Sequence, residues 1–245
     1  TQSRSSAASD VYKRQGAQSI ILNETKSQKY LGLVIDSQLS FQDHIDYVKS
    51  KVAKRIGALY RSKSLLPLKY RKMFVNALML PQFDYLDIIW CRAGKTKLNA
   101  IDVLYKKVAK IALDVDVREP SLNVYKNMNW LPLHLRRQLH LSTYMYKIVN
   151  EIAPPQFLNK FAYVSGGSRD AEKCNLYTPK DRSHKSFSYL GTKCWNSIPL
   201  SIRTAETDKK FSENLKSSFM NEVCNNSSYQ ANNKFDYFYE IEKAD

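Results

Sequence analysis

The stretch that decides the fold is Lys29-Tyr30-Leu31-Gly32-Leu33-Val34-Ile35-Asp36, followed by Leu39-Ser40-Phe41 and Asp43-His44-Ile45. Its first part favours a β-strand, because tyrosine, valine and isoleucine are enriched in strands. Its second part carries a Ser-x-x-Asp pattern, Ser40 to Asp43, which commonly precedes a helix. The stretch therefore predicts a passage from a small sheet into a helical region.

A second short apolar run, Ser19–Leu22, precedes this stretch, and the polar residues 23–27 separate the two. Two β-rich runs around a polar turn predict an antiparallel hairpin. Gly32 then lies inside a strand, where glycine indicates either a bulge or a close approach of the backbone to a ligand. Both interpretations stay open.

The first fifteen residues are set aside from the fold analysis. Ser5 to Gln15 resembles the conceptual translation of a transposase adapter used to prepare sequencing libraries. The segment has no apolar stretch of the kind found in a secretory signal, and such scars are excluded from fold reasoning. The native sequence is therefore expected to start at Gly16, where the reading frame was truncated.

Helical periodicity dominates the sequence after Phe41. One predicted helix has apolar residues at spacings of three and four and basic residues on its other face. The apolar set is Ile45, Val48, Val52, Ile56 and Leu59, and the basic set is Lys49, Lys51, Lys54, Arg55 and Arg61. A second helix from Pro67, interrupted at Pro81, and a third from about Thr96 to Leu113 complete a predicted helical bundle.

Helices also dominate the sequence beyond Pro120. The predicted ones are Ser121 to Met128, about Leu133 to Ile152, and Asp208 to Met220. The fold class is therefore mainly α, with an N-terminal β-hairpin, a helical bundle and an α-rich C-terminal region. The expected division is 1–15 adapter-derived, 16–38 hairpin, 39–117 bundle, 118–222 α-rich region with a loop at about 163–186, and 223–245 loosely ordered tail.

The charge is strongly basic, +15 over 245 residues, and aromatic residues make up 12% of the chain. An excess of this size favours polyanionic partners such as RNA, DNA or an acidic membrane surface, although a merely basic protein stays possible. The longest apolar runs fall far short of the ~20 residues that span a bilayer, so no membrane partner is expected. Four widely scattered cysteines predict reduced thiols in an intracellular protein.

The opening stretch resembles a signature of non-LTR retrotransposon reverse transcriptases of the jockey and LINE kind, K-Y-L-G-x-x-I-D-x-x-L-x-(W/F)-x-x-H-I. Three further segments resemble boxes of this family in the same order. They are Leu80–Tyr85 with Ile89-Trp90, Trp130–Leu133 with Arg136-Arg137, and Cys194–Pro199 with Ile202-Arg203. Four ordered boxes are more specific than any one of them. Phe41 and Cys194 are small departures, replacing a frequent Trp and a frequent Leu.

The resemblance implies that the hairpin ends the polymerase palm, as the primer grip, and that the bundle is the thumb. Tyr30, Leu31 and Gly32 would then help to set the primer end. The partners implied are RNA and an RNA–DNA hybrid, held through phosphates without sequence preference. The residues chosen for phosphate contacts are Lys49, Lys54, Arg55, Lys106 and Lys110. For any single one of them, a solvated helix face is the simpler interpretation.

The catalytic residues of the family are not found in this sequence. Reverse transcription uses two divalent ions held by palm carboxylates, which the family supplies from a (F/Y)-x-D-D box and an earlier aspartate. The chain has no adjacent aspartate pair. The palm, fingers and endonuclease of the same polyprotein are thus expected upstream, with Mg²⁺ only in that palm. No cofactor is expected here, and the chain alone is expected not to polymerise DNA.

The remaining acidic and histidine residues were weighed as metal ligands. Asp84 with Asp87, and Asp114 with Asp116, are expected to be solvated or capping carboxylates rather than ligands. His134, His140 and His184 are expected to have no Cys or Asp partner, so no metal site is predicted. His44 is expected to pack or to form a hydrogen bond where its helix begins.

A second hypothesis stays open at this point. The chain could be a non-catalytic helical RNA-binding or interaction module from a decayed or host-adopted element, or it could have no function. An intact upstream frame encoding a Y/F-x-D-D box would favour the polymerase, and stop codons there would favour a relic.

Overall fold

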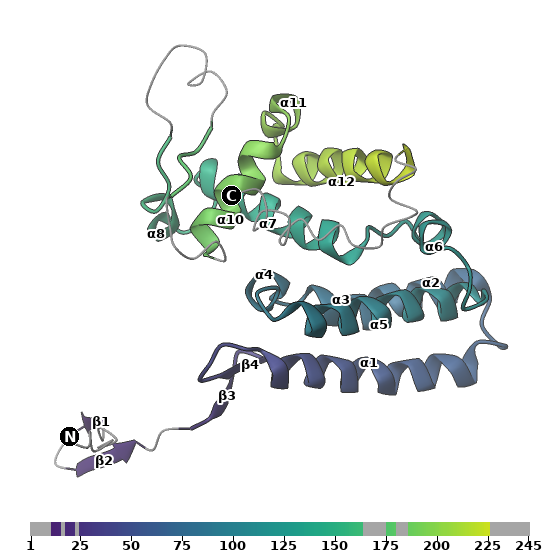
Figure 1. Cartoon of the computed structure of the whole chain (residues 1–245), viewed down its shortest axis with the longest axis horizontal. Coiled ribbons are helices and arrows are strands. Elements are labelled where there is room, and N and C mark those ends of the chain that lie inside the picture. The colour runs from purple at the N-terminus through teal and green to yellow at the C-terminus, as the bar shows by residue number, and fades with distance from the viewer. Residues whose placement is uncertain (1–10, 16–17, 23–24, 164–174, 180–185, 226–245) are drawn as a thin grey trace, which may run out of the picture.

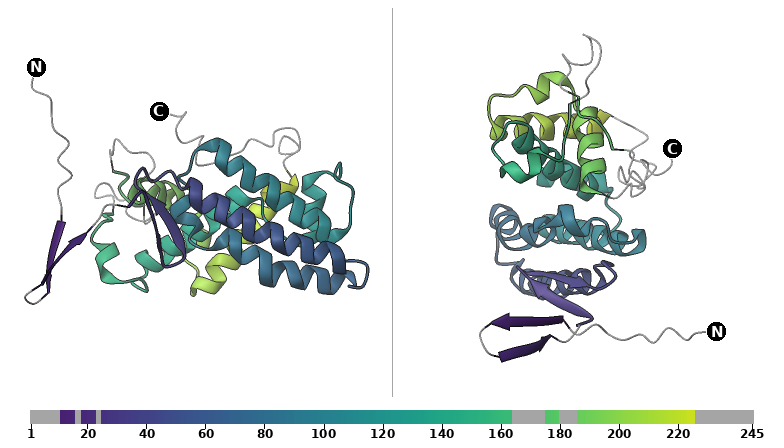
Figure 2. Two further views of the ribbon diagram at one scale, coloured as in Figure 1. Left: turned by 90° about the horizontal axis from the view of Figure 1, so that it is seen from below. Right: turned by 90° about the vertical axis from the view of Figure 1, so that its left-hand side faces the viewer.

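The structure is a computed structural model that describes residues 11–15, 18–22, 25–163, 175–179 and 186–225. Across these residues the chain is mainly helical, with small antiparallel hairpins at its N-terminal side, which confirms the predicted fold class. The helices lie in successive layers, seen stacked one above another in Figure 1 and from two further directions in Figure 2. No helix among these residues is long and apolar enough to cross a bilayer.

The strand pairing differs from the prediction. β1 (Val11–Gln15) pairs with β2 (Gln18–Leu22), and β3 (Ser27–Tyr30) pairs with β4 (Leu33–Asp36), both antiparallel. The predicted pairing of the 19–22 run with the 30–35 run is therefore wrong. The second apolar run instead folds back on itself.

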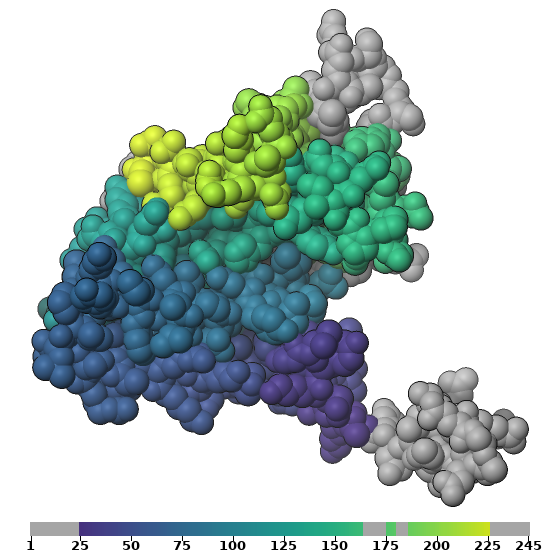
Figure 3. Space-filling view, turned by 180° about the vertical axis from the view of Figure 1, so that it is seen from behind, coloured from purple at the N-terminus to yellow at the C-terminus, as the bar shows by residue number. Residues whose placement is uncertain are grey.

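Backbone conformation explains this turn. Leu31 and Gly32 both have positive φ, 45° and 84°. Two successive residues of positive φ form the type I′ turn that suits a two-residue hairpin loop, because its twist matches the strands. Gly32 is thus a turn residue, and the prediction that it lies inside a strand is wrong. In the space-filling view, the hairpin of β3 and β4 projects from one end of the helical body (Figure 3).

α1 (Gln42–Ser62) forms as predicted and buries Ile45, Val48, Val52 and Leu59. Its start differs from the predicted Ser40 cap, because the residue before the helix is Phe41 in a left-handed conformation. The backbone N–H groups entering the helix are held instead by the carboxylate of Asp36.

The next layer contains α2 (Leu68–Phe74), η1 (Val75–Met79), α3 (Leu80–Asp84), α4 (Asp87–Trp90) and α5 (Lys95–Leu113). α2, η1 and α3 follow one another directly, and η1 is a π-helix. Proline lacks an N–H and disrupts a helix interior. The predicted interruption at Pro81 thus takes the form of a π segment just before it, and the helix itself continues to Asp84. α5 packs against both α1 and α2.

The last layer contains α6 (Ser121–Met128), α7 (Leu133–Val149), α8 (Pro155–Leu158), α10 (Phe187–Ser197), α11 (Leu200–Arg203) and α12 (Asp208–Asn225). α7 packs against α10 and α12. α12 runs past the predicted end at Met220, because Val223 is also buried. Of the predicted loop at 163–186, residues 164–174 and 180–185 lie outside the described residues, as does most of the predicted tail.

Two hydrophobic cores hold these layers. The first core contains the buried faces of α1 and α5 and includes Val52, Phe83, Tyr105 and Trp130. The second lies between α7, α10 and α12 and includes Leu131, Met145, Trp195, Phe211 and Leu215. Cys91, Cys194 and Cys224 are reduced thiols, as predicted, and Cys174 lies outside the described residues.

Candidate nucleic-acid interface

The hairpin tip is exposed and anchored. The side chains of Tyr30 and Leu31 are 65% and 72% exposed. Underneath, the hydroxyl of Tyr85 donates a hydrogen bond to the carbonyl of Leu31. A Cβ atom at Gly32 would lie 3.2 Å from a ring carbon of Tyr85, so the backbone and the ring are in close contact. Tyr85, between α3 and α4, therefore fixes the tip and leaves two apolar side chains facing outward.

A cavity of about 380 Å³ lies beside this tip, and its lining includes Lys29, His44, Tyr47, Lys51, Gln82 and Tyr85. We call it the tip pocket. The ammonium groups of Lys29 and Lys51 lie 4.8 and 4.4 Å from the centre of the Tyr47 ring. Lys29 also donates to the Tyr47 hydroxyl at 3.1 Å. Hydrogen bonds from Lys51 and then Lys29 hold the pKa of Tyr47 below its usual value.

His44 lines the same pocket from the first turn of α1 and is buried. Its Nδ1 accepts the N–H of Val34 at 3.4 Å, which confirms its predicted role at the helix start. Burial, followed by the charge of Lys51, lowers the pKa of His44, so the ring is neutral near pH 7. In a neutral ring whose Nδ1 accepts, Nε2 carries the proton. Among the residues that the structure describes, this Nε2 has no hydrogen-bond partner.

The five basic residues predicted to contact phosphates lie on two helices that pack together, α1 and α5. Lys54 is exposed, and Arg55 and Lys106 are half-buried. Lys49 is paired with Asp46 at 3.1 Å, and Lys110 donates to the carbonyl of Val117. These five residues do not line the tip pocket, and their contact with phosphate stays a prediction.

The tip pocket was missed by reasoning from sequence. Tyr47 and Lys51 are four residues apart on α1, and that spacing alone puts them on one face. The contact of Lys29 with Tyr47 could not be predicted from spacing, because Lys29 lies on β3 and reaches Tyr47 only through the packing of the hairpin against α1. The useful signal was a tyrosine inside a lysine-rich helix face, next to the predicted hairpin.

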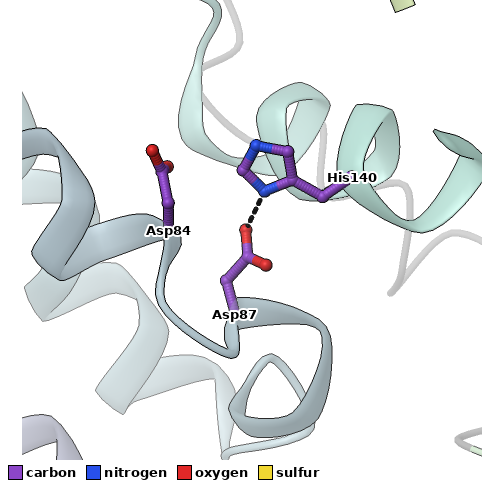
Figure 4. Close-up of side chains that lie close together, drawn as sticks. All are labelled: Asp84, Asp87 and His140. Atoms are coloured by element: carbon purple, nitrogen blue, oxygen red, sulfur yellow. Dashed lines mark hydrogen bonds and ion pairs between the residues drawn. The ribbon is translucent and has the colours of Figure 1, made fainter. Parts of the chain in front are cut away.

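Asp84, Asp87 and His140 lie together between α3, α4 and α7 (Figure 4). Asp87 is buried, and its Oδ2 lies 2.6 Å from Nδ1 of His140. The prediction that His140 has no Asp partner is therefore wrong. Asp87 is also not solvated, and burial raises its pKa against the opposing hydrogen bond from His140. The two residues are 53 positions apart, so their spacing in the sequence gave no sign of the contact.

This cluster is already neutralised by its own partners. Arg136 donates to both carboxylate oxygens of Asp84, from Nε and from Nη2. The carboxylate of Asp87 is paired with the His140 ring. A cation entering here would meet a guanidinium that already holds one of the two carboxylates. We interpret the cluster as two pairs that join α3 and α4 to α7.

Asp114 and Asp116, which were predicted to be solvated or capping carboxylates, behave as expected. Asp114 ends α5 in a left-handed conformation and pairs with Lys63 at 2.7 Å and Arg71 at 3.4 Å. Asp116 accepts the backbone N–H of Arg118 at 2.7 Å. Both aspartates are exposed. His184 lies outside the described residues.

The structure defines a mainly helical, basic chain with a lysine- and tyrosine-lined pocket beside an anchored hairpin. Over 161 residues, 64% of its length, the chain is 20% identical to a probable RNA-directed DNA polymerase from transposon X-element of Drosophila melanogaster. Over 128 residues, 51% of its length, it is 23% identical to a probable RNA-directed DNA polymerase from transposon BS of the same organism. These similarities identify a region related to reverse transcriptases.

The matched regions cover 17% and 14% of those two proteins, so the chain spans less than a fifth of the curated relatives it matches. No protein-family model and no solved structure matches the chain.

Proposed function

We propose that this chain is the C-terminal part of a non-LTR retrotransposon RNA-directed DNA polymerase, of the jockey or LINE kind, and that it holds the primer and template. The similarity to two transposon polymerases carries this proposal. The hairpin of β3 and β4 acts as the primer grip, through Tyr30, Leu31 and Gly32. α1, α2 and α5 form the thumb, and the protein acts inside the cell.

The charge distribution supports binding to a phosphate backbone. The chain carries a net charge of +15, and α1 buries one apolar face while it presents lysines and arginines on another. Contacts to phosphates position a duplex without reading its sequence. An RNA–DNA hybrid is therefore held by shape and charge, and Lys49, Lys54, Arg55, Lys106 and Lys110 supply part of that charge.

The catalytic centre belongs to other parts of the polyprotein in this proposal. Two-metal chemistry requires carboxylates that are free to bind ions. Among the described residues, the one group of three possible ligands contains Asp84 and Asp87, which are held by Arg136 and His140. These residues do not fit a two-magnesium site, and we place the palm with its Mg²⁺, and the endonuclease, upstream in the same polyprotein.

The dependence of binding on salt tests the proposal. The purified chain should bind a fluorescently labelled RNA–DNA hybrid in an anisotropy titration. If roughly five basic side chains engage phosphates, the slope of log K against log salt should be about −4 to −5. K54Q/K106Q should make that slope shallower by about 2, because each lost phosphate contact removes about 1.

K160Q/K209Q is the matched control for this titration, because both lysines are exposed and lie in the C-terminal region. It should leave the slope close to that of the wild type. A wild-type slope near zero would contradict the proposal.

A further inference from the structure

The tip pocket gathers two positive charges around one phenol ring. Lys29 comes from β3 and Lys51 from α1, and both ammonium groups lie within 5 Å of the centre of the Tyr47 ring. Across the described part of the chain, neither lysine has a carboxylate partner. Asp46, which directly precedes Tyr47 in sequence, is taken by Gln42 at 2.5 Å and Lys49 at 3.1 Å. Two like charges brought together without a counter-charge favour an anion between them.

The neutral groups around the pocket also suit an anion. The Tyr47 oxygen accepts a hydrogen bond from Lys29, so its own hydrogen is available to an acceptor. Gln82 lines the wall and carries an amide NH₂. The ring of His44 also lines the pocket and adds no charge to it, because burial lowers its pKa. A phosphate group has several acceptor oxygens and no hydrogen to donate when ionised, so it matches this set of donors.

We propose that the tip pocket binds one phosphodiester group of a nucleic-acid backbone, with Lys29 and Lys51 as its charge partners and the Tyr47 hydroxyl as a donor. The inference rests on the proposed function, because it names nucleic acid as the source of the phosphate. A single phosphodiester carries one negative charge and leaves one of the two lysines uncompensated.

The position of the pocket favours a chain of phosphates over a free phosphate ion. Lys51 lies one turn before Arg55 on α1, and four residues correspond to about 6 Å along a helix axis. Lys54 and Arg61 continue the basic set toward the far end of the helix. A backbone that leaves the pocket along α1 therefore meets further cations, whereas a free ion gains nothing from them.

The test compares four proteins in the anisotropy titration with the RNA–DNA hybrid: the wild type, K29Q/K51Q, Y47F and K160Q/K209Q. K29Q/K51Q should bind on the order of tenfold more weakly, with a salt slope shallower by about 1, because the contact with one phosphate is lost. Y47F keeps the ring and loses the hydroxyl, so it should lose roughly threefold in affinity with an unchanged slope. K160Q/K209Q removes two charges elsewhere and should match the wild type.

A second measurement separates the possible sources of phosphate. Inorganic phosphate at millimolar concentration is added during thermal unfolding of the wild type and of K29Q/K51Q, both of which should have the same midpoint without phosphate. The inference expects little effect on either protein, because a free ion lacks the further contacts along α1.

The outcomes separate this inference from the proposed function. If the wild type binds the hybrid and K29Q/K51Q binds as tightly as K160Q/K209Q, the tip pocket is overturned and the proposed function stands. If the wild type does not bind the hybrid, and phosphate raises the thermal unfolding midpoint of the wild type but not of K29Q/K51Q, the pocket binds a free ion. Both proposals are then overturned. If neither ligand binds, both are overturned as well.

Discussion

Asp36 joins the hairpin to α1 through one carboxylate. Its oxygens accept the backbone N–H groups of Phe41 at 2.7 Å, Ser40 at 3.0 Å and Gln38 at 3.1 Å. The Ser40 hydroxyl donates to it at 3.2 Å. These hydrogen bonds, with the Ser40 N–H first, lower the pKa of Asp36 below its ordinary 3.8. Asp36 therefore orders the segment that leads into α1, whereas the Ser40 hydroxyl accepts the first helical N–H, that of Gln42, at 3.4 Å.

Asp36→Asn should destabilise the fold by about 1 kcal/mol, because it keeps the size of the side chain and removes the charge that strengthens its hydrogen bonds. The pKa of Asp36 is lower in the folded chain, so its stabilisation is present above pH 3.8 and is lost as the pH falls through the lowered value. The difference between wild type and variant in urea unfolding should thus be constant from pH 7 to about 5 and shrink below pH 4. Ser37→Ala, at an exposed neighbour, should show no such dependence, and a gap that persists at low pH would contradict this account.

At the scale of elements, two glycines in helices play opposite roles. Gly191 lies in α10 against α7, where an added Cβ would meet the sulfur of Met145 at 2.6 Å. Met145 is fully buried, so it has no room to withdraw. Gly57 lies within α1, and its nearest contact would be a guanidinium nitrogen of Arg61 at 3.5 Å. Close packing requires glycine at the first position only.

Gly191→Ala should destabilise the chain by about 1–3 kcal/mol, the range for overpacking a core. Gly57→Ala should stabilise it by about 0.5–1 kcal/mol, because glycine is a poor residue within a helix. Denaturant unfolding monitored by circular dichroism measures both changes. Equal effects of the two substitutions would show that the contact between α7 and α10 is looser than described.

The elements that sequence predicts best are the long amphipathic helices. α1 and α5 were expected because their apolar residues repeat every three or four positions and form one stripe each. The pairing of the strands could not be decided in this way, because Ser19–Leu22 and Tyr30–Ile35 are both short and β-rich. The two positive φ values at Leu31 and Gly32 decided it, and a leucine gives no sign of that conformation.

The candidate site was predictable only where its residues are close in sequence. Tyr30, Leu31 and Gly32 stay together at the hairpin tip, as their order requires. His140 and Asp87 meet only because α7 packs against α4. Lys29 and Tyr47 are 18 positions apart and lie on different elements. Contacts of this kind depend on packing between layers, which residue spacing does not describe.

At the scale of the whole molecule, two cores share a short connection. The adjacent residues Trp130 and Leu131 belong to different cores. Trp130 stacks on Tyr105 at 4.7 Å between ring centres, and its Nε1 donates to Asn76 at 2.8 Å. The pair of Asp84 and Arg136 adds a second link, from α3 to α7. The two cores are therefore tied at two places, each with a hydrogen bond between residues more than 50 positions apart in sequence.

A double-mutant cycle on Asp84→Asn and Arg136→Met should show a coupling of about 1–3 kcal/mol in urea unfolding, because removing either partner leaves the other half-buried and unpaired. The two side chains are only 23% and 16% exposed. Lys147 and Asp208, at 3.3 Å and 38% and 44% exposed, form a matched control pair between α7 and α12. Its coupling should be at most about 1 kcal/mol. Purely additive effects at Asp84 and Arg136 would show that the pair does not tie the cores.

Tyr85 and Asp84 are neighbours in sequence and hold opposite parts of the molecule. Tyr85 donates a hydrogen bond to the backbone of the hairpin tip, and Asp84 accepts one from Arg136 on α7. One peptide unit is thus attached both to the turn between β3 and β4 and to α7, which belongs to the second core. A displacement of this peptide unit would therefore alter both contacts together. The hairpin tip and α7 are thus linked through two adjacent residues, although they are more than 100 positions apart in sequence.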